Sequence, residues 1–416
     1  MLHPVCRIRS TATCRVHAVR RVGRRSRVTD LVVLSLEAWD QVWRRNQYLL
    51  AGLLRNNSDL RVLFVEPPED PLHAAISRHR PRLGAGLSNV GGVEGIGDGR
   101  LWRFQTTKWL PRSVDGRADD RLSAAVERAV KRIHFTRSVL WINDPGGAVV
   151  LERTGWPSLY DITDDWIAAD RTPRENSRLR RAEDLLMRRC DEIVVCSPAL
   201  LVSKGPARPI GASPVTLIGN AVDLEGYRRP FRRPADLPSG RIALYAGTIH
   251  TDRIDLPLTE SIGESLHARS MSLVMVGPAA ISPEWRQRLE RAGVVLLGPR
   301  VHTSVPDYLR SADVLIVPHL IDEFTKSLDP IKAYEYRAAR RPVVATGVPG
   351  FDDTGDPFVT VADRAKFGEA VIAVLEDRLA TPDQAGDLGG PAVPDWSERV
   401  REMAEVLRRV GQASRP

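Results

Sequence analysis

Residues 325–346 read TKSLDPIKAYEYRAARRPVVAT, and this stretch decides the fold class. A polar loop leads to a helix that opens at Asp329-Pro330, and a buried strand at 342–346 follows the helix. Proline at the first helical position has its φ angle preset and lacks an amide hydrogen that the helix would leave unbonded. Aspartate before it can cap the free amides. The order of loop, helix and buried strand predicts one αβ unit of a parallel sheet.

The start of this predicted helix suits an anionic ligand. Free backbone amides and the helix dipole favour negative charge at a helix N-terminus. Lys332 lies in the first turn, and Glu335 lies one turn further along the same face. Amides and lysine could bind phosphates, while a carboxylate could bind ribose hydroxyls. The stretch therefore indicates a nucleotide diphosphate site, although an ordinary αβ unit with a capped helix fits the same residues.

The composition is that of a globular protein with two domains. The chain has 416 residues, 43% of them hydrophobic and 27% charged, which is enough for two buried cores. No run of about 18 apolar residues occurs that could span a membrane. The four cysteines, at positions 6, 14, 190 and 196, lack paired metal-ligand spacing. We therefore expect a reducing cytoplasm and no structural zinc site.

The net charge of +8 arises from the N-terminal segment. Residues 1–28 contain eight arginines and no acidic residue, so the rest of the chain is formally neutral. The charge therefore does not predict a nucleic-acid-binding face. We expect 1–28 to be a basic, disordered extension; contact with anionic lipid at the inner face of the membrane and a transit peptide are alternatives.

The first half of the chain predicts a Rossmann-like domain at 29–226. Short apolar runs alternate with segments of helical periodicity, the pattern of a doubly wound parallel sheet. Residues 70–99 read as an irregular loop. Strands are expected at 31–36, 61–66, 101–104, 138–142, 158–162, 192–196 and 215–218, and helices at 43–54, 121–133 and 173–189.

A second αβ series follows a proline- and arginine-rich segment, which we interpret as a linker at 227–240. The second Rossmann-like domain spans 241–395, and a C-terminal helix occupies 396–416. Strands are expected at 242–245, 272–276, 294–297, 314–317, 343–345 and 358–361, and helices at 256–270, 283–292, 305–310, 330–339 and 365–379.

Polar residues gather beyond the carboxyl ends of the predicted strands, where open αβ sheets bind their ligands. In the first half, Asp161 lies near the end of one such strand. In the second half, Gly247 and His250 follow the opening strand, and Lys326–Glu335 follow the fourth. Two such edges facing each other would form a cleft between the domains.

These motifs resemble the GT-B glycosyltransferases, specifically the large group 1 family of retaining enzymes. The resemblance covers the chain from about residue 30 onward and is strongest at Val314–Thr346. Tyr245–Thr248 resembles the opening of the family's second domain, and Leu217–Asp223 resembles its interdomain turn. Tyr160–Trp166 is similar to the subgroup related to teichuronic acid biosynthesis transferases.

The resemblance implies a sugar transfer with retention, from a nucleotide-sugar donor to a glycan, lipid-linked or small-molecule acceptor. Neither a metal nor another cofactor is expected. Glu335 would bind the donor ribose, while Arg253 and Lys332 would offset the diphosphate charge. The donor site would also include Gly247, Lys326 and Ser327. The candidate catalytic residues are Asp161, Asp329 and His250, with Asp161 orienting the acceptor or acting as a base.

Two residues depart from the family pattern. The first of its two glutamates falls at Ser327, with Asp329 as a substitute from a different position. The glycine before the final strand of the motif is Arg340, which costs about 1 kcal/mol relative to glycine if the position is left-handed. A degenerate nucleotide-sugar-binding protein, or an epimerase on the same fold, therefore stays open as an alternative.

Overall fold

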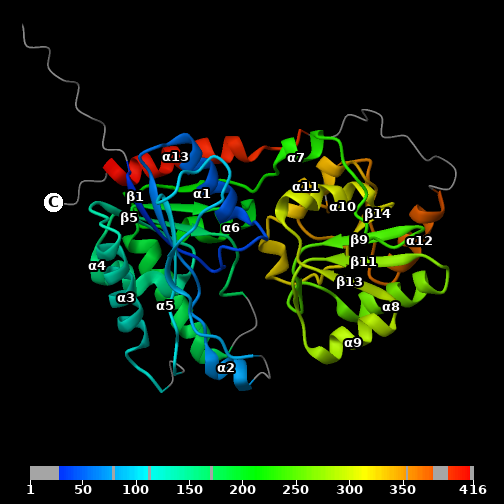
Figure 1. Cartoon of the computed structure of the whole chain (residues 1–416), viewed down its shortest axis with the longest axis horizontal. Coiled ribbons are helices and arrows are strands. Elements are labelled where there is room, and N and C mark those ends of the chain that lie inside the picture. Colours follow the sequence, from blue (N-terminus) through cyan, green and yellow to red (C-terminus); the bar gives the residue numbers. More distant parts are fainter. Residues whose placement is uncertain are drawn as a thin grey trace, which may run out of the picture.

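The computed structural model describes residues 28–76, 80–110, 114–168, 172–352, 355–377 and 392–412. It contains two αβ domains side by side, as Figure 1 shows. The predicted basic extension lies outside the described residues except for Val28, as do two of the cysteines. The other two, Cys190 and Cys196, are buried and form no disulfide with a described residue.

The first domain is built on an eight-stranded sheet of order β3-β4-β2-β1-β5-β6-β7-β8. Its strands pair in parallel except for β3 and β4, which are antiparallel. The central strands β1, β5 and β6 are buried throughout, as their continuous apolar runs predict. The strands are β1 (Asp30–Leu34), β2 (Arg61–Val65), β3 (Gly86–Asn89), β4 (Leu101–Gln105), β5 (Ser138–Ile142), β6 (Ser158–Ile162), β7 (Glu192–Val195) and β8 (Val215–Leu217). The helices are α1 (Arg45–Asn56), α2 (Pro71–Ile76), α3 (Ala118–Arg132), α4 (Ala148–Thr154), α5 (Pro173–Arg189) and α6 (Pro198–Lys204).

The second domain has a six-stranded parallel sheet of order β13-β11-β9-β14-β15-β16. The strands are β9 (Ile242–Ala246), β11 (Ser272–Val276), β13 (Val294–Gly298), β14 (Val314–Val317), β15 (Val343–Ala345) and β16 (Val359–Val361). A two-stranded ladder of β10 (Ile249–His250) and β12 (Ala279–Ala280) lies beyond its edge. The helices are α7 (Leu224–Arg228), α8 (Leu256–His267), α9 (Pro283–Arg291), α10 (Val305–Ser311), α11 (Ile331–Ala339) and α12 (Phe367–Asp377).

Every strand predicted from the sequence is present, with bounds that differ by a residue or two. The prediction of an irregular loop at 70–99 was wrong in part, because α2 and β3 form within it. Both are short: α2 buries no side chain, and β3 is an antiparallel edge strand without an apolar run. Neither element therefore leaves the periodic pattern that predicts buried structure.

The predicted linker at 227–240 belongs to the second domain instead. Tyr227 and Leu237 are buried in that domain's core. The proline- and arginine-rich sequence around these two residues does not indicate this packing. The chain crosses between the domains at Val222, beside a second crossing near residue 395. The Val222 amide donates to the Pro394 carbonyl at 3.1 Å, and the Trp396 amide donates to the Val222 carbonyl at 3.2 Å. Two adjacent segments therefore join the domains.

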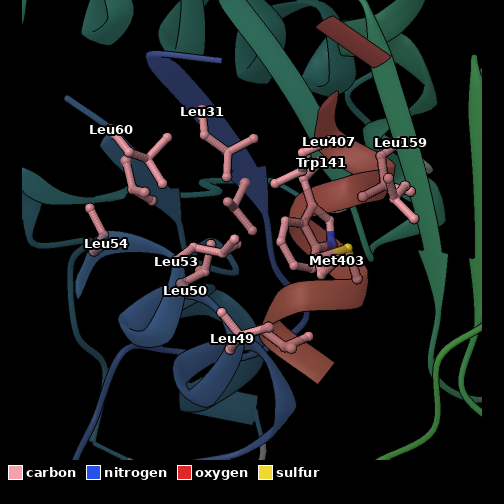
Figure 2. Packing of buried hydrophobic residues seen from close by; sticks show 14 of the residues in the cluster. Leu31, Leu49, Leu50, Leu53, Leu54, Leu60, Trp141, Leu159, Met403 and Leu407 are labelled. Atoms are coloured by element: carbon pink, nitrogen blue, oxygen red, sulfur yellow. The ribbon is translucent and has the colours of Figure 1, made fainter. Parts of the chain in front are cut away.

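The C-terminal helix, α13 (Trp396–Gln412), returns to the first domain and packs against α1. Figure 2 shows Met403 and Leu407 of α13 beside Trp141 of β5, within one buried cluster. Full burial of one such apolar side chain is worth about 1.5–3 kcal/mol. The last helix in the sequence therefore completes the core of the first domain.

In the described part of the chain, each helix is too short or too polar to cross a bilayer.

Candidate functional site

A cleft of about 770 Å³ opens between the carboxyl edges of the two sheets. In each sheet the order reverses at one point, between β1 and β5 in the first domain and between β9 and β14 in the second. Residues that follow these four strands line the cleft: Glu37 and Asn143 on one wall, Gly247 and His319 on the other. The cleft thus lies at both topological switch points, where αβ sheets bind ligands.

Gly247 and Gly277 shape the backbone of the second wall. Both have φ of +142°, a conformation that favours glycine. A Cβ atom on Gly277 would lie 2.1 Å from the Gly247 carbonyl oxygen, so the turns after β9 and β11 touch through their backbones. A Cβ atom on Gly247 would lie 3.3 Å from the Lys332 ammonium. The predicted donor-site residue Gly247 therefore lies beside Lys332.

Lys332 and Glu335 both line the cleft from α11, as their spacing predicts. The Lys332 ammonium donates to the Tyr245 hydroxyl at 3.0 Å and lies 4.8 Å from the centre of that ring. Burial raises the pKa of Glu335 to about 7, and the nearby Lys332 charge opposes this rise. A cation and a carboxyl group with a near-neutral pKa thus face the same space.

His250, the last residue of β10, and Arg253, in the turn after it, both line the cleft. Arg253 forms an ion pair with Asp164 of the first domain at 3.1 Å, and its guanidinium lies over the Phe324 ring at 5.4 Å. Burial raises the pKa of Asp164, and the Arg253 charge opposes the rise. The His250 Nδ1 atom accepts from the Asp252 amide at 3.3 Å. The structure therefore brings both predicted residues into the cleft, with Arg253 spanning it.

Asp329 does not cap α11, contrary to the prediction. Pro330 occupies the N-cap position and makes no side-chain cap bond. The Asp329 carboxylate instead accepts hydrogen bonds from the Asn220 amide and, at 2.6 Å, from the Tyr334 hydroxyl. Asn220 lies in the interdomain turn, and its backbone amide, rather than an amide of α11, donates to the Asp329 carboxylate. Asp329 lines the cleft while fixing α11 to that turn.

Asp161 lies beneath the cleft rather than in its lining. Its side chain is fully buried and pairs with Arg45 of α1 through bonds of 3.2 and 3.3 Å. The Asn143 amide group donates to it at 3.2 Å. Arg45 itself lines the cleft and also donates to the Asn220 side chain at 3.2 Å. These contacts indicate that Asp161 positions Arg45 and Asn143.

Lys326 and Ser327, both predicted in the donor site, do not line the cleft. The exposed Lys326 ammonium pairs with Glu323 at 2.8 Å. The Ser327 hydroxyl donates to the Phe324 carbonyl at 2.7 Å, and the Ser327 carbonyl accepts from the Ser197 hydroxyl at 2.6 Å. A short 3-10 turn at Thr325–Ser327 directs both side chains away from the cleft, which the linear sequence did not reveal.

Sequence reasoning missed Glu37 and His302. Glu37 follows β1, forms an ion pair with Arg44 at 3.2 Å, and has a pKa raised to about 7 by burial. Glu37 could have been predicted from the sequence, because ligands of αβ sheets bind beyond the carboxyl ends of the strands. His302 stacks on Trp43 of the first domain with ring centres 3.8 Å apart, and its amide donates to the Gln41 carbonyl at 3.0 Å. No local sequence signal marks that contact.

The chemistry of the cleft is that of a mixed-charge site for a polar, anionic ligand. Arg44, Arg253, Arg300 and Lys332 supply positive charge, and α11 begins at the lining of the cleft with Ile331 and Lys332. Among the described residues, no group of three or more His, Cys, Asp or Glu side chains gathers as metal ligands would.

Comparison with known proteins identifies the second domain. Residues 240–377 match the family model "Glycosyl transferases group 1". The chain is 26% identical over 234 residues to the putative teichuronic acid biosynthesis glycosyltransferase TuaH of Bacillus subtilis (strain 168). That alignment covers 54% of this chain, and the chain spans 59% of the length of this relative.

Solved structures share the whole fold. Sucrose-phosphate synthase from Thermosynechococcus elongatus aligns with a TM-score of 0.65 at 17% identity, over 93% of this chain and 100% of that chain. The α,α-trehalose 6-phosphate synthase from Burkholderia multivorans aligns with a TM-score of 0.55 at 12% identity, over 93% and 97%. The predicted GT-B fold, with two Rossmann-like domains, is thereby confirmed.

Proposed function

We propose that this chain, whose second domain is a group 1 glycosyltransferase domain on a GT-B fold, transfers a sugar from a nucleotide-sugar donor to an acceptor. The observation that carries the proposal is the placement of Lys332 and Glu335. They lie one turn apart on α11 and both line the cleft, with Lys332 beside the Gly247 turn. A phosphate-binding cation and a ribose-binding carboxyl group need this arrangement.

The donor diphosphate would lie between the Gly247 turn and α11. Lys332 and Arg253 would stabilise the negative charge that develops as the nucleoside diphosphate leaves, together with the amides at the start of α11. Since these groups already supply positive charge, we propose transfer without a metal ion. We also propose retention of the anomeric configuration. Glu335 would accept hydrogen bonds from the ribose hydroxyls.

The acceptor would bind against the first domain, where Glu37, Asp40 and Arg44 line the opposite wall. Carboxylates and a guanidinium are suited to sugar hydroxyl groups. A relative named for teichuronic acid biosynthesis favours a glycan or lipid-linked acceptor over a small molecule. Among the described residues, Cys190 and Cys196 are buried and form no disulfide, which favours a reducing compartment, and we place the protein in the cytoplasm.

A nucleotide-sugar-binding protein without transfer activity is the second candidate. Ser327 favours it, because this position lacks a carboxylate and its hydroxyl bonds to the Phe324 carbonyl rather than facing the cleft. Turnover of the donor separates the two candidates, since a binding protein would leave the nucleotide sugar intact.

The deciding experiment measures release of nucleoside diphosphate from a panel of nucleotide sugars. We expect slow hydrolysis of one donor by the native protein. Lys332→Gln should lower kcat/KM by roughly 100-fold or more, because it removes a charge that stabilises the leaving group. Lys326→Gln, a matched change outside the cleft, should leave kcat/KM unchanged. Equal losses in both variants, or no release from any donor, would contradict the proposal.

A further inference from the structure

Two buried side chains of the second domain contact the Lys332 ammonium. Tyr245 lies in β9 and His319 follows β14, the two neighbouring strands between which the sheet order reverses (Figure 1). The Lys332 ammonium donates to the Tyr245 hydroxyl at 3.0 Å and lies 3.4 Å from the His319 Nε2 atom. Tyr245 and His319 are only 1% and 3% exposed. A cation of α11 is therefore fixed by two groups of the sheet.

Both groups are neutral hydrogen-bond acceptors. The Tyr245 hydroxyl donates its one proton to the Thr248 carbonyl at 3.2 Å, so its oxygen accepts from Lys332. Because an ammonium can only donate, the His319 Nε2 atom also accepts, which places the ring proton on Nδ1. Burial, followed by the charges of Lys332 and Arg253, holds the pKa of His319 well below its usual range. The two acceptors therefore orient the ammonium without neutralising its charge.

Backbone contacts fix the position of His319. Its carbonyl accepts from the Thr346 hydroxyl, which follows β15, at 2.9 Å. It also pairs with Ile254 in an antiparallel bridge, and the amide of Leu320 donates to the Arg253 carbonyl at 2.9 Å. The segments that follow β10, β14 and β15 are therefore joined at His319, and the backbone that carries its ring is held from two sides.

The Lys332 ammonium retains one N–H for a ligand. An ammonium has three donors, and in the part of the chain that the structure describes two of them have acceptors. A Cβ atom on Gly247 would lie 3.3 Å from the Lys332 Nζ atom and 3.1 Å from the Tyr245 hydroxyl, so glycine leaves the ammonium uncovered there. Gly247 and Lys332 both line the cleft. An anionic oxygen in the cleft can therefore reach the third donor.

We propose that Tyr245 and His319 are positioning residues that direct the third N–H of Lys332 toward a phosphate oxygen of the donor. The inference rests on the proposed function for the identity of this ligand. A lysine ammonium is carried on a flexible four-carbon chain, and two fixed acceptors restrict it before the donor binds. Since both acceptors are neutral, the positive charge stays available to the diphosphate as it leaves. A carboxylate in place of either acceptor would cancel that charge.

Calorimetric titration of the full-length protein with inorganic pyrophosphate, without added metal, tests this proposal. Tyr245→Phe and His319→Leu each remove one acceptor, and each change is also made in a Lys332→Gln background. His319→Gln restores an acceptor, because the glutamine carbonyl oxygen can take the place of Nε2. Tyr160→Phe is the control, since it removes a buried tyrosine hydroxyl from the core of the first domain. Melting temperatures show that the variants fold, and if one does not, the other carries the comparison.

Tyr245→Phe and His319→Leu should each weaken pyrophosphate binding at least roughly tenfold, since misplacing a positioned group by about 1 Å costs on the order of 100-fold in rate. His319→Gln should recover most of the loss, and Tyr160→Phe should bind like the native protein. In the Lys332→Gln background, neither change should weaken binding further, because both act through the ammonium. Equal losses with and without Lys332, or no loss from either single change, would overturn the proposal.

Turnover of the donor separates this inference from the proposed function. Tyr245→Phe and His319→Leu should lower kcat more than they raise KM, because Lys332 acts most strongly on the charge that develops as the diphosphate leaves. Pyrophosphate binding that depends on both acceptors, without donor turnover, would contradict only the proposed function. Donor turnover that neither variant changes would contradict only the positioning role. Absence of pyrophosphate binding by the native protein would contradict both.

Discussion

Glu335 carries a carboxyl group whose ionisation opposes folding. Its pKa rises from an ordinary value of 4.5 to about 7 because the folded protein buries it. Below pH 4.5 the group is protonated in both states and does not affect stability. As the pH rises to 7 the unfolded chain loses this proton first, so the free energy of unfolding falls. The site therefore holds a destabilising group, as ligand-binding sites commonly do.

Glu335→Gln should remove this pH dependence. Above pH 7 the variant should be more stable than the native protein by on the order of 2–3 kcal/mol, since each unit of pKa shift corresponds to about 1.4 kcal/mol. The difference should shrink to zero as the pH falls from 7 to 4.5. Urea denaturation across this range measures it, with the exposed Glu376→Gln as a control. A difference that stays constant with pH would contradict the assigned pKa.

Arg340 ends α11 in a left-handed conformation, with φ of 52° and ψ of 46°. The family pattern has glycine at this position, which is typical of a left-handed residue, and Arg340 is left-handed in the structure. Arg340→Gly should raise the free energy of unfolding by about 1 kcal/mol, because glycine has no Cβ atom to strain. Arg337→Gly, inside α11, should instead lower it by more than about 1 kcal/mol, because it also removes the Arg337 hydrogen bond to the Gly350 carbonyl. Thermal unfolding compares the two, and a loss of stability in Arg340→Gly would contradict the account.

Within Lys326–Glu335, motif position predicted facing direction only for the residues that a helix carries. Lys332 and Glu335 lie on a helix, whose period fixes which side chains share a face. Lys326 and Ser327 lie in a 3-10 turn, and Asp329 precedes the helix, where hydrogen bonds to distant residues decide the conformation. Such bonds have no signature in the linear sequence.

At the scale of elements, α1 and α13 pack so closely that one methyl group matters. A Cβ atom on Gly52 of α1 would lie 2.4 Å from Val400 Cγ2 of α13. Glycine therefore allows the helices to approach, although alanine is the better helix former by about 1 kcal/mol.

Gly52→Ala should lower the free energy of unfolding by about 1–3 kcal/mol through overpacking. Val400→Ala should remove the clash, so that the double variant is more stable than the sum of the single changes predicts. A double-mutant cycle by urea denaturation gives the coupling energy, which should favour the double variant by at least about 0.5 kcal/mol. Strict additivity would show that the helices do not meet at these two residues.

For the whole molecule, the sequence predicted two Rossmann-like domains and a cleft, because buried strands and amphipathic helices leave strong periodic patterns. It did not predict that α13 returns to the first domain, since amphipathicity shows that a face is buried but not against what. The mistaken linker at 227–240 has a similar cause, because its two anchoring side chains are isolated among prolines and arginines.

Contacts across the cleft join the domains at several places. His302 stacks on Trp43, Arg253 pairs with Asp164, and the Ser197 hydroxyl donates to the Ser327 carbonyl. Lys332 and Glu335 of α11 and Glu37 of the first domain therefore line the same cleft. We propose that this cleft binds a nucleoside diphosphate through Glu335.

The most direct test measures the stabilisation of the protein by nucleoside diphosphates of each base at pH 8, without added metal. It compares the native protein with Glu335→Gln and Glu376→Gln. One base should stabilise the native protein and Glu376→Gln by about 2.7 kcal/mol at 100 times its dissociation constant, and Glu335→Gln by clearly less at the same concentration. No stabilisation by any nucleoside diphosphate, or equal stabilisation of all three proteins, would contradict the claim.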